Sequence, residues 1–281
     1  MSDPREVLTR PAAPPALTVR YGGHPDHVAD VWSPAAGARP AVAGLAPLVV
    51  YVHGGFWRAQ WDRTHARPLC QALSEAGYAV AAIEYRRVGQ RGGGWPGSFD
   101  DVALALDTVP ALVADRLGQL GPVVHAGHSA GGHFVLWDAV RHRLPRDTTW
   151  HRDTRPELAG VLALAPVCDL AAGYRDRLGD GAVGELLGGG PDAVPDRYAV
   201  ADPAALPYPQ VPAVLVHGTA DDRVPVTQSE SYTAPAGGDA PAGADPVPRL
   251  VAVPGADHFA VIDPLSGAWP HVLAALASLS R

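Results

Sequence analysis

The sequence predicts an α/β protein built on a mostly parallel central sheet of about eight strands, with helices on both faces. Six short segments are almost entirely apolar, which is typical of strands that are covered on both faces. Helical patterns fall between them, and parallel strands need such crossover connections. The six predicted strands are residues 48–55, 78–86, 122–129, 160–167, 212–218 and 248–255.

The predicted helices follow the same alternation along the chain. Their residues are 63–76, 98–116, 130–143, 226–233 and 266–280. Two earlier segments, 17–22 and 27–34, alternate apolar and polar side chains instead. Such alternation favours an antiparallel hairpin at the edge of the sheet, which completes the count of about eight strands.

The length of 281 residues allows one large α/β domain, which we expect to span residues 18–281 after a flexible N-terminal segment, 1–17. Within the domain, residues 169–209 are rich in Gly, Pro and Asp, and we expect an excursion above the sheet or a lid there. Residues 143–158 resist assignment in the same way. The low-complexity stretch 234–247 is typical of a flexible surface loop.

Composition excludes several classes of partner. The formal net charge is -7 at pH 7, and the 22 basic residues, all arginine, are scattered along the chain, which argues against a nucleic-acid binder. No continuous apolar segment resembles a signal peptide or spans a bilayer. We therefore expect a cytoplasmic protein that acts on a small molecule, without nucleic acid or membrane; the sequence leaves the oligomeric state open, a homodimer included.

Cysteine usage fits the same expectation. The chain holds two cysteines, Cys70 in a predicted helix and Cys168 at the end of a predicted strand. Two are too few for a disulfide framework, so we expect reduced, buried thiols.

One pentapeptide carries the strongest chemical signal. Residues 127–131 read GHSAG, which fits the G-x-S-x-G nucleophile elbow, where a strand turns sharply into a helix and exposes a serine hydroxyl. A predicted strand precedes the motif and a predicted helix follows it, and this context makes the match specific. Ser129 is therefore the candidate nucleophile.

A serine hydroxyl needs a base, and the base needs an orienting acid; in this architecture both follow the serine, acid first. The strand end at 212–218 is followed by Asp221 and Asp222, and the next strand end by His258. We favour Asp221 as the acid because it falls where the loop first turns inward, and Asp222 remains the alternative. Among the histidines, His258 alone has the position that the base requires, in the loop directly after the last predicted strand.

The remaining histidines suggest neither a metal nor a cofactor. His24 and His27 lack partner ligands at any familiar metal spacing, and His125 lies inside a predicted strand. The predictions therefore include no metal ion and no cofactor.

A tetrahedral intermediate needs hydrogen-bond donors that are fixed in advance. The backbone N–H of Ala130 follows the nucleophile, and the HGGFW segment, residues 53–57 directly after the strand run VVYV, supplies Gly55 and Phe56 as further donors. We interpret His53 as a residue that ties this loop together. Trp57 either lines the pocket or packs beneath the loop; Trp57 and His128 are the candidate substrate contacts.

Taken together, HGGFW, GHSAGG, HGTADDRVP and GADHF resemble the α/β-hydrolase superfamily, from about residue 20 to the C-terminus. The nearest branch holds kynurenine formamidases (arylformamidases) and the related hormone-sensitive-lipase-like carboxylesterases. The resemblance implies an α/β-hydrolase fold with Ser129 as nucleophile, Asp221 as acid and His258 as base. Arylformamidases typically carry HGGxW, which this loop matches, whereas Phe56 departs from the HGGG of many lipase-like esterases.

A second stretch, residues 83–102, resembles the place where relatives show a Tyr-Arg pair and then a proline before the next helix, here separated by a Gly-rich insertion. Arg86, Arg87 and Trp95 of this stretch either contact substrate or form structural pairs.

The function expected from these residues is hydrolysis through an acyl-serine intermediate. The substrate class implied by the resemblance is an aryl formamide similar to N-formylkynurenine, or a short-acyl ester. The alternatives are a general carboxylesterase and a hydrolase-fold protein that binds a small ligand without turning it over.

Overall fold

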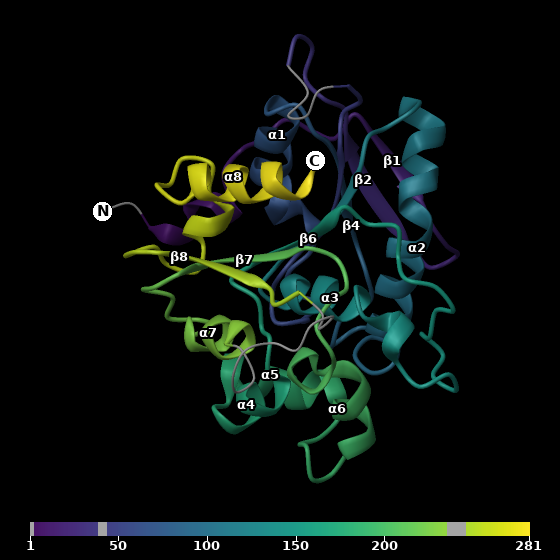
Figure 1. The fold of residues 1–281 in the computed structure, drawn as a ribbon, viewed down its shortest axis with the longest axis vertical. Helices are drawn as coiled ribbons and strands as arrows, with labels where there is room; N and C mark the ends of the chain where they lie inside the picture. The colour runs from purple at the N-terminus through teal and green to yellow at the C-terminus, as the bar shows by residue number, and fades with distance from the viewer. Residues whose placement is uncertain (1–2, 39–43, 235–245) are drawn as a thin grey trace.

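The computed structural model describes residues 3–38, 44–234 and 246–281. Their eight strands form one sheet in the order β1-β2-β4-β3-β5-β6-β7-β8 (Figure 1). The strands are β1 Leu17–Arg20, β2 Val28–Trp32, β3 Leu48–Val52, β4 Ala79–Ile83, β5 Val123–His128, β6 Gly160–Leu164, β7 Ala213–Gly218 and β8 Arg249–Val253. Strands β3 to β8 pair in parallel, while β1 and β2 form an antiparallel hairpin at the edge. The predicted parallel sheet and its lead-in hairpin are confirmed.

Helices cover both faces of the sheet, with α1 and α8 on one side and α2 and α3 on the other (Figure 1). The helices are α1 Arg67–Glu75, α2 Gly97–Leu117, α3 Ala130–Asp138, α4 Leu170–Arg175, α5 Leu178–Leu187, α6 Pro195–Ala201, α7 Thr227–Thr233 and α8 Trp269–Leu279. Short 3-10 helices are η1 Pro4–Leu8, η2 Arg63–Ala66, η3 Arg141–Arg143, η4 Pro203–Ala205 and η5 Ala260–Ile262. No helix in the described ranges has both the length and the apolar character that crossing a bilayer demands.

Alternation along the central strands divides the core into two layers. In β3, Leu48, Val50 and Val52 pack with α2 and α3, whereas Val49 and Tyr51 pack with α1 and α8. Both sets of side chains are buried, because successive residues of a strand point to opposite faces. This double burial explains why the central strands are almost entirely apolar.

The segment 169–209 is helical, which the sequence analysis did not predict. It contains α4, α5, α6 and η4, which gather with α7 at one end of the molecule (Figure 1). Within α5, Gly179, Asp180 and Gly181 have left-handed, non-helical backbone angles. The regular helix after them contains Gly184, and its Val183 and Leu186 are completely buried. Burial of these apolar side chains outweighs the low helix propensity of glycine.

The N-terminal segment differs from the expected flexible arm. From residue 3 it forms η1, in which Val7 is 1% exposed. The Arg10 guanidinium also pairs with both carboxylate oxygens of Asp263, with Nη2 donating to Oδ2 over 2.9 Å. Packing and the ion pair therefore hold this segment on the domain. The loop predicted at 234–247 lies mostly outside the described residues.

Both cysteines are free thiols with buried side chains, as predicted. Cys70 lies in α1 and Cys168 follows β6. Burial raises the pKa of both thiols far above the ordinary value, so they stay protonated and unreactive.

The strand order creates a crevice at the carboxyl ends of β3 and β5. From β3 the chain passes to β4 on one side, then crosses to β5 on the other side of β3. The loops after β3 and β5 therefore leave the sheet in opposite directions, and open α/β sheets bind ligands at such a point. The HGGFW loop and Ser129 follow these two strands.

The first turn of α3 approaches β3 so closely that residue 131 has no room for a side chain. A Cβ on Gly131 would lie 2.0 Å from the Val52 carbonyl oxygen. We predict that Gly131→Ala lowers the free energy of unfolding by about 2–3 kcal/mol through overpacking, although alanine favours helices over glycine. Urea unfolding measures the effect. Gly267→Ala is the matched control, because nothing lies within 4 Å of a Cβ there; equal stability of the two variants would refute the steric argument.

Candidate active site

Ser129 sits in a strained turn between β5 and α3. Its φ of 55° and ψ of -117° are rare for a residue with a side chain. Glycines permit this turn: a Cβ on Gly127 would lie 2.3 Å from the Gly131 carbonyl oxygen, and one on Gly132 would lie 2.7 Å from the Pro166 side chain. The Ser129 N–H donates to the Leu164 carbonyl of β6 over 2.8 Å, which anchors the turn to the sheet. The predicted elbow is therefore present.

An aspartate and a histidine from the ends of β7 and β8 form a buried pair. The His258 Nδ1–H donates to Asp221 Oδ2 over 2.6 Å. The other oxygen, Oδ1, accepts from the backbone N–H groups of Arg223 and Val224, each over 2.8 Å. Burial alone would raise the pKa of the Asp221 carboxyl, but hydrogen bonds from His217 and His258 hold it well below the ordinary value. Asp221 is therefore an anion that fixes the orientation of the imidazole.

His217, on β7, is a member of this network that the sequence analysis missed. Its Nε2–H lies 2.9 Å from the Val224 carbonyl oxygen and 3.1 Å from Asp221 Oδ2, and its Nδ1 lies 2.7 Å from Ser229 Oγ. The side chain is completely buried. A polar residue in the otherwise apolar run AVLVHG was the available signal.

The structure distinguishes between the candidate acids. The side chain of Asp222 is 77% exposed and faces Arg223 at 3.5 Å. Asp257 accepts from the N–H groups of Phe259 and Ala260, as a turn residue does. Asp221 is thus the carboxylate that contacts His258, in agreement with the choice made from the sequence.

Ser129 and His258 line one cavity of about 240 Å³. Their residues are 2% and 4% exposed, so both side chains reach solvent only through it. The Ser129 hydroxyl makes no hydrogen bond to any described residue, His258 included. Contacts of this kind are often long in ligand-free enzymes and shorten when substrate is bound.

His128, the residue before the serine, also lines the cavity. Its Nε2–H donates to the His258 carbonyl over 3.0 Å, and the two rings are 4.6 Å apart. Burial lowers the pKa of His128 well below the ordinary histidine value, so the ring is neutral. Its Nδ1 lone pair is buried without a partner. His128 therefore supports the loop that carries His258 and presents an acceptor at the site.

The loop after β3 has an unusual backbone. Gly55, Phe56 and Trp57 have φ angles of 115°, 51° and 58°, all in the left-handed range. At Gly54, a Cβ would lie 3.0 Å from the Ser129 Cβ, so glycine lets the loop approach the nucleophile. Within the described part of the chain, the N–H groups of Gly55, Phe56 and Ala130 form no hydrogen bond, and Gly55 and Phe56 line the cavity. These are the three N–H groups that the sequence analysis named as candidate oxyanion donors.

Trp57 packs beneath the loop, and the prediction that it contacts substrate is wrong. Its side chain is completely buried, does not line the cavity, and packs edge-on against His133, with ring centroids 5.5 Å apart. The left-handed φ of Trp57 turns the chain so that its indole enters the core. Trp61, four residues later, lines the cavity.

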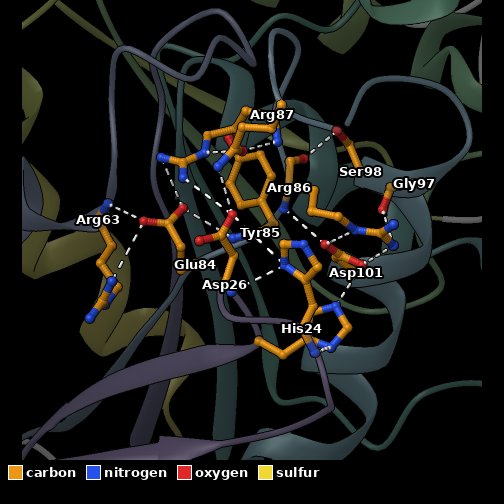
Figure 2. A network of polar contacts seen from close by, with 12 residues as sticks. His24, Asp26, Arg63, Glu84, Tyr85, Arg86, Arg87, Gly97, Ser98 and Asp101 are labelled. Carbon is orange, nitrogen blue, oxygen red and sulfur yellow. Dashed lines mark hydrogen bonds and ion pairs between the residues drawn. The ribbon is translucent and has the colours of Figure 1, made fainter. Parts of the chain in front are cut away.

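A buried ion pair holds the start of this loop. His53 donates from Nδ1 to the Gly54 carbonyl and from Nε2 to Glu84 Oε1, each over 2.8 Å. Both ring nitrogens therefore face oxygen atoms of the loop and of Glu84. Burial would raise the pKa of the Glu84 carboxyl, but His53 and Arg87 lower it to about 2. Figure 2 shows Glu84 between Arg63 and Arg87, in the network that supports the loop from below. The interpretation of His53 as the residue that ties the loop together fits this geometry.

The Tyr-Arg stretch is structural. Arg86 is paired with Asp101, donating from Nε to Oδ2 over 2.8 Å, and Arg87 lies 3.7 Å from Asp26 (Figure 2). Trp95 packs against Phe99, with ring centroids 5.1 Å apart. Arg86, Arg87 and Trp95 do not line the cavity. Of the two readings that the sequence left open, the structural one applies.

Comparisons with known proteins agree with this architecture. The chain has the fold of esterase B from Lactobacillus rhamnosis (TM-score 0.71, 20% identity, 98% of this chain and 89% of the other). A truncated carbohydrate esterase from gut microbiota has the same fold (TM-score 0.70, 18% identity, 96% of this chain and 100% of the other). The protein is a member of the α/β-hydrolase superfamily.

At the level of sequence, residues 30–234 match the BD-FAE family model, and the chain belongs to this family. Two similar proteins come from Mycobacterium tuberculosis. One is named "Probable carboxylic ester hydrolase LipM" (27% identity, 76% of this chain, 50% of the relative), and the other "Carboxylesterase NlhH" (33%, 51% and 43%). The chain spans about half the length of these relatives.

The low pKa of Glu84 leads to a prediction about acid stability. A carboxyl whose folded pKa is depressed contributes stability above its unfolded pKa, here 4.5, and loses it as the pH falls toward about 2. We expect Glu84→Gln to lower the free energy of unfolding at pH 7 by about 3 kcal/mol, with the difference from wild type shrinking below pH 4.5. Urea unfolding between pH 7 and 3 measures this. The exposed Glu157→Gln is the control, and a difference that stays constant with pH would contradict the assignment.

Proposed function

We propose that the protein is a serine-dependent carboxylesterase that cleaves small, short-acyl esters. One observation carries the proposal: Ser129, in its strained elbow, and His258, held by a buried carboxylate, line the same cavity. The names of the two mycobacterial relatives support the same class of reaction.

In this proposal His258 is the general base. Because Asp221 accepts its Nδ1–H, the neutral ring carries its lone pair on Nε2, where it can take the proton of the Ser129 hydroxyl. The Ser129 oxygen then forms a bond to the carbonyl carbon, and the imidazolium returns the proton to the departing alkoxide. Water repeats the sequence on the acyl-serine and releases the acid. Asp221 remains ionised throughout and stabilises the imidazolium.

The tetrahedral oxygen would lie among the N–H groups of Gly55, Phe56 and Ala130. These donors are fixed before substrate arrives, since strained backbone angles and close glycine contacts set their positions. Donors that need no reorganisation supply several kcal/mol of transition-state stabilisation.

A fluorophosphonate probe tests whether Ser129 is an activated nucleophile. We expect stoichiometric labelling of wild type at this residue, no labelling of Ser129→Ala, and a fall in kcat of several orders of magnitude in that variant. The control is Ser278→Ala in α8, remote from the cavity, which should label as wild type does. Folded wild-type protein that resists the probe and hydrolyses no ester would instead favour a binding protein built on this fold.

The two adjacent aspartates give an internal comparison. Asp221→Asn should lower kcat by orders of magnitude, because the amide no longer stabilises the imidazolium, though less severely than Ser129→Ala. Asp222→Asn should leave the steady-state hydrolysis of p-nitrophenyl acetate within about twofold of wild type, because its side chain is exposed. Greater damage from Asp222→Asn would refute the assignment of the acid.

Aryl formamides are a second proposed substrate class. The HGGFW loop supports it through its resemblance to the arylformamidase loop, and an aniline departs more readily than an alkyl amine. We expect N-formylkynurenine to be hydrolysed alongside p-nitrophenyl acetate and butyrate, with Ser129→Ala eliminating all three activities. Comparing kcat/KM values on the three substrates is decisive, since a negligible rate on the formamide would leave the ester activity alone.

A further inference from the structure

We infer that the preferred substrates carry a carboxylate or another anionic group, held by arginines in the wall of the cavity. This inference rests on the proposed function. Arg5, Arg58 and Arg223 all line the cavity that contains Ser129, whereas Asp180 supplies the one carboxylate among its described lining residues. A cationic cavity is unexpected in a chain whose formal net charge is -7. Such a local excess attracts anions into a cleft.

The three arginines come from separate parts of the chain, and hydrogen bonds fix the backbone of each. The N–H of Arg5 in η1 donates to Asp3 Oδ1 over 2.9 Å, and that of Arg58, after the HGGFW loop, donates to the Gly55 carbonyl over 3.0 Å. As described above, the N–H of Arg223 donates to the carboxylate of Asp221. Two of these arginines are thus attached directly to the oxyanion loop and to the acid loop.

Their guanidinium groups keep free donors. Each arginine meets its acidic partner through Nε: Arg58 with Glu185 at 2.7 Å, Arg223 with Asp222 at 3.5 Å, and Arg5 with Asp3 at 3.5 Å. Within the described residues, the terminal Nη groups of these arginines make no hydrogen bond. All three acidic partners are exposed, and such surface pairs are weak. The forked Nη donors that bind a carboxylate with two hydrogen bonds therefore remain available.

Apart from the three arginines and Asp180, the lining residues of the wall have neutral or apolar side chains. His65 and His128 line it as neutral rings, because burial lowers the pKa of His65 to about 3 and that of His128 well below the ordinary value. Phe56, Trp61 and Phe259 add aromatic surface. In such surroundings the attraction between a guanidinium and an anion is stronger than in bulk water. The wall thus matches a substrate with an apolar or aromatic body and an anionic end.

Paired substrates test this inference. The first pair, 4-acetoxybenzoate and 4-acetoxybenzamide, differs by an anion on the leaving group. The second pair, the phenyl monoester of adipic acid and phenyl pentanoate, differs by an anion on the acyl group. The kcat/KM ratio of anionic to neutral member, corrected for the rates with hydroxide, should reach about tenfold in at least one pair. Addition of NaCl should lower that ratio by screening. A ratio near one in both pairs would overturn the inference.

Variants locate the arginine responsible. Arg223→Gln or Arg58→Gln should lower the ratio three- to tenfold, and the double variant should bring it close to one. The matched control is Arg116→Gln in α2, which removes the same charge from an exposed site outside the cavity and should keep the wild-type ratio. The labelling rate of Ser129 with an uncharged fluorophosphonate checks that each variant has kept its site. A high ratio that survives in the double variant would overturn the role of these arginines.

These experiments distinguish failure of the esterase proposal from failure of the inference about anionic substrates. If wild type hydrolyses none of the four esters and resists the probe, the esterase proposal is wrong. If it hydrolyses the neutral esters and labels at Ser129 but shows no preference for anions, the esterase proposal stands and the inference about anionic substrates alone is wrong.

Discussion

The contact between the first turn of α3 and the end of β3 is the constraint on which the site depends. Gly131 lets the helix begin against the carbonyl oxygens of Val52 and His53, at distances that no side chain would allow. This contact sets where Ser129 turns out of the sheet. It also sets where the following loop must pass, so Gly54 approaches the same serine from the other side. The proposed nucleophile and the proposed oxyanion donors are thereby positioned by one piece of backbone packing.

Two buried carboxylates near the site hold imidazole rings in opposite ways. Glu84 and the Gly54 carbonyl together form hydrogen bonds with both nitrogens of His53, so the network fixes that ring on both sides. Asp221 accepts a hydrogen bond from Nδ1 of His258, whereas Nε2 of that ring makes no hydrogen bond to any described residue. The first ring is held at both nitrogens, and the second keeps one nitrogen without a protein partner among the described residues at the cavity. The number of hydrogen bonds made by each ring thus separates a structural histidine from a candidate base.

The sequence was sufficient for the sheet and the three catalytic candidates because each depends on local patterns. Apolar runs located the central strands, and strand ends located Ser129, Asp221 and His258. Helix α5 was missed because its glycines lower helix propensity, and packing of Val183 and Leu186 compensates. The burial of Trp57 was not predictable, since a single left-handed φ decides whether its side chain faces the pocket or the core. The lining arginines depend on tertiary folding and have no local signature.

The N-terminal 3-10 helix supplies part of the cavity wall from outside the region that the chain shares with its family. The region shared with the family, residues 30–234, contains Ser129 and Asp221. Two parts of the cavity wall lie outside this region: Arg5 and Leu8 on one side, and His258 and Phe259 on another. The ion pair between Arg10 and Asp263 and the packing of Val7 together hold the first of these two parts on the domain. Exchange of this short N-terminal segment would therefore change one wall of the cavity without disturbing the packed turn at Ser129.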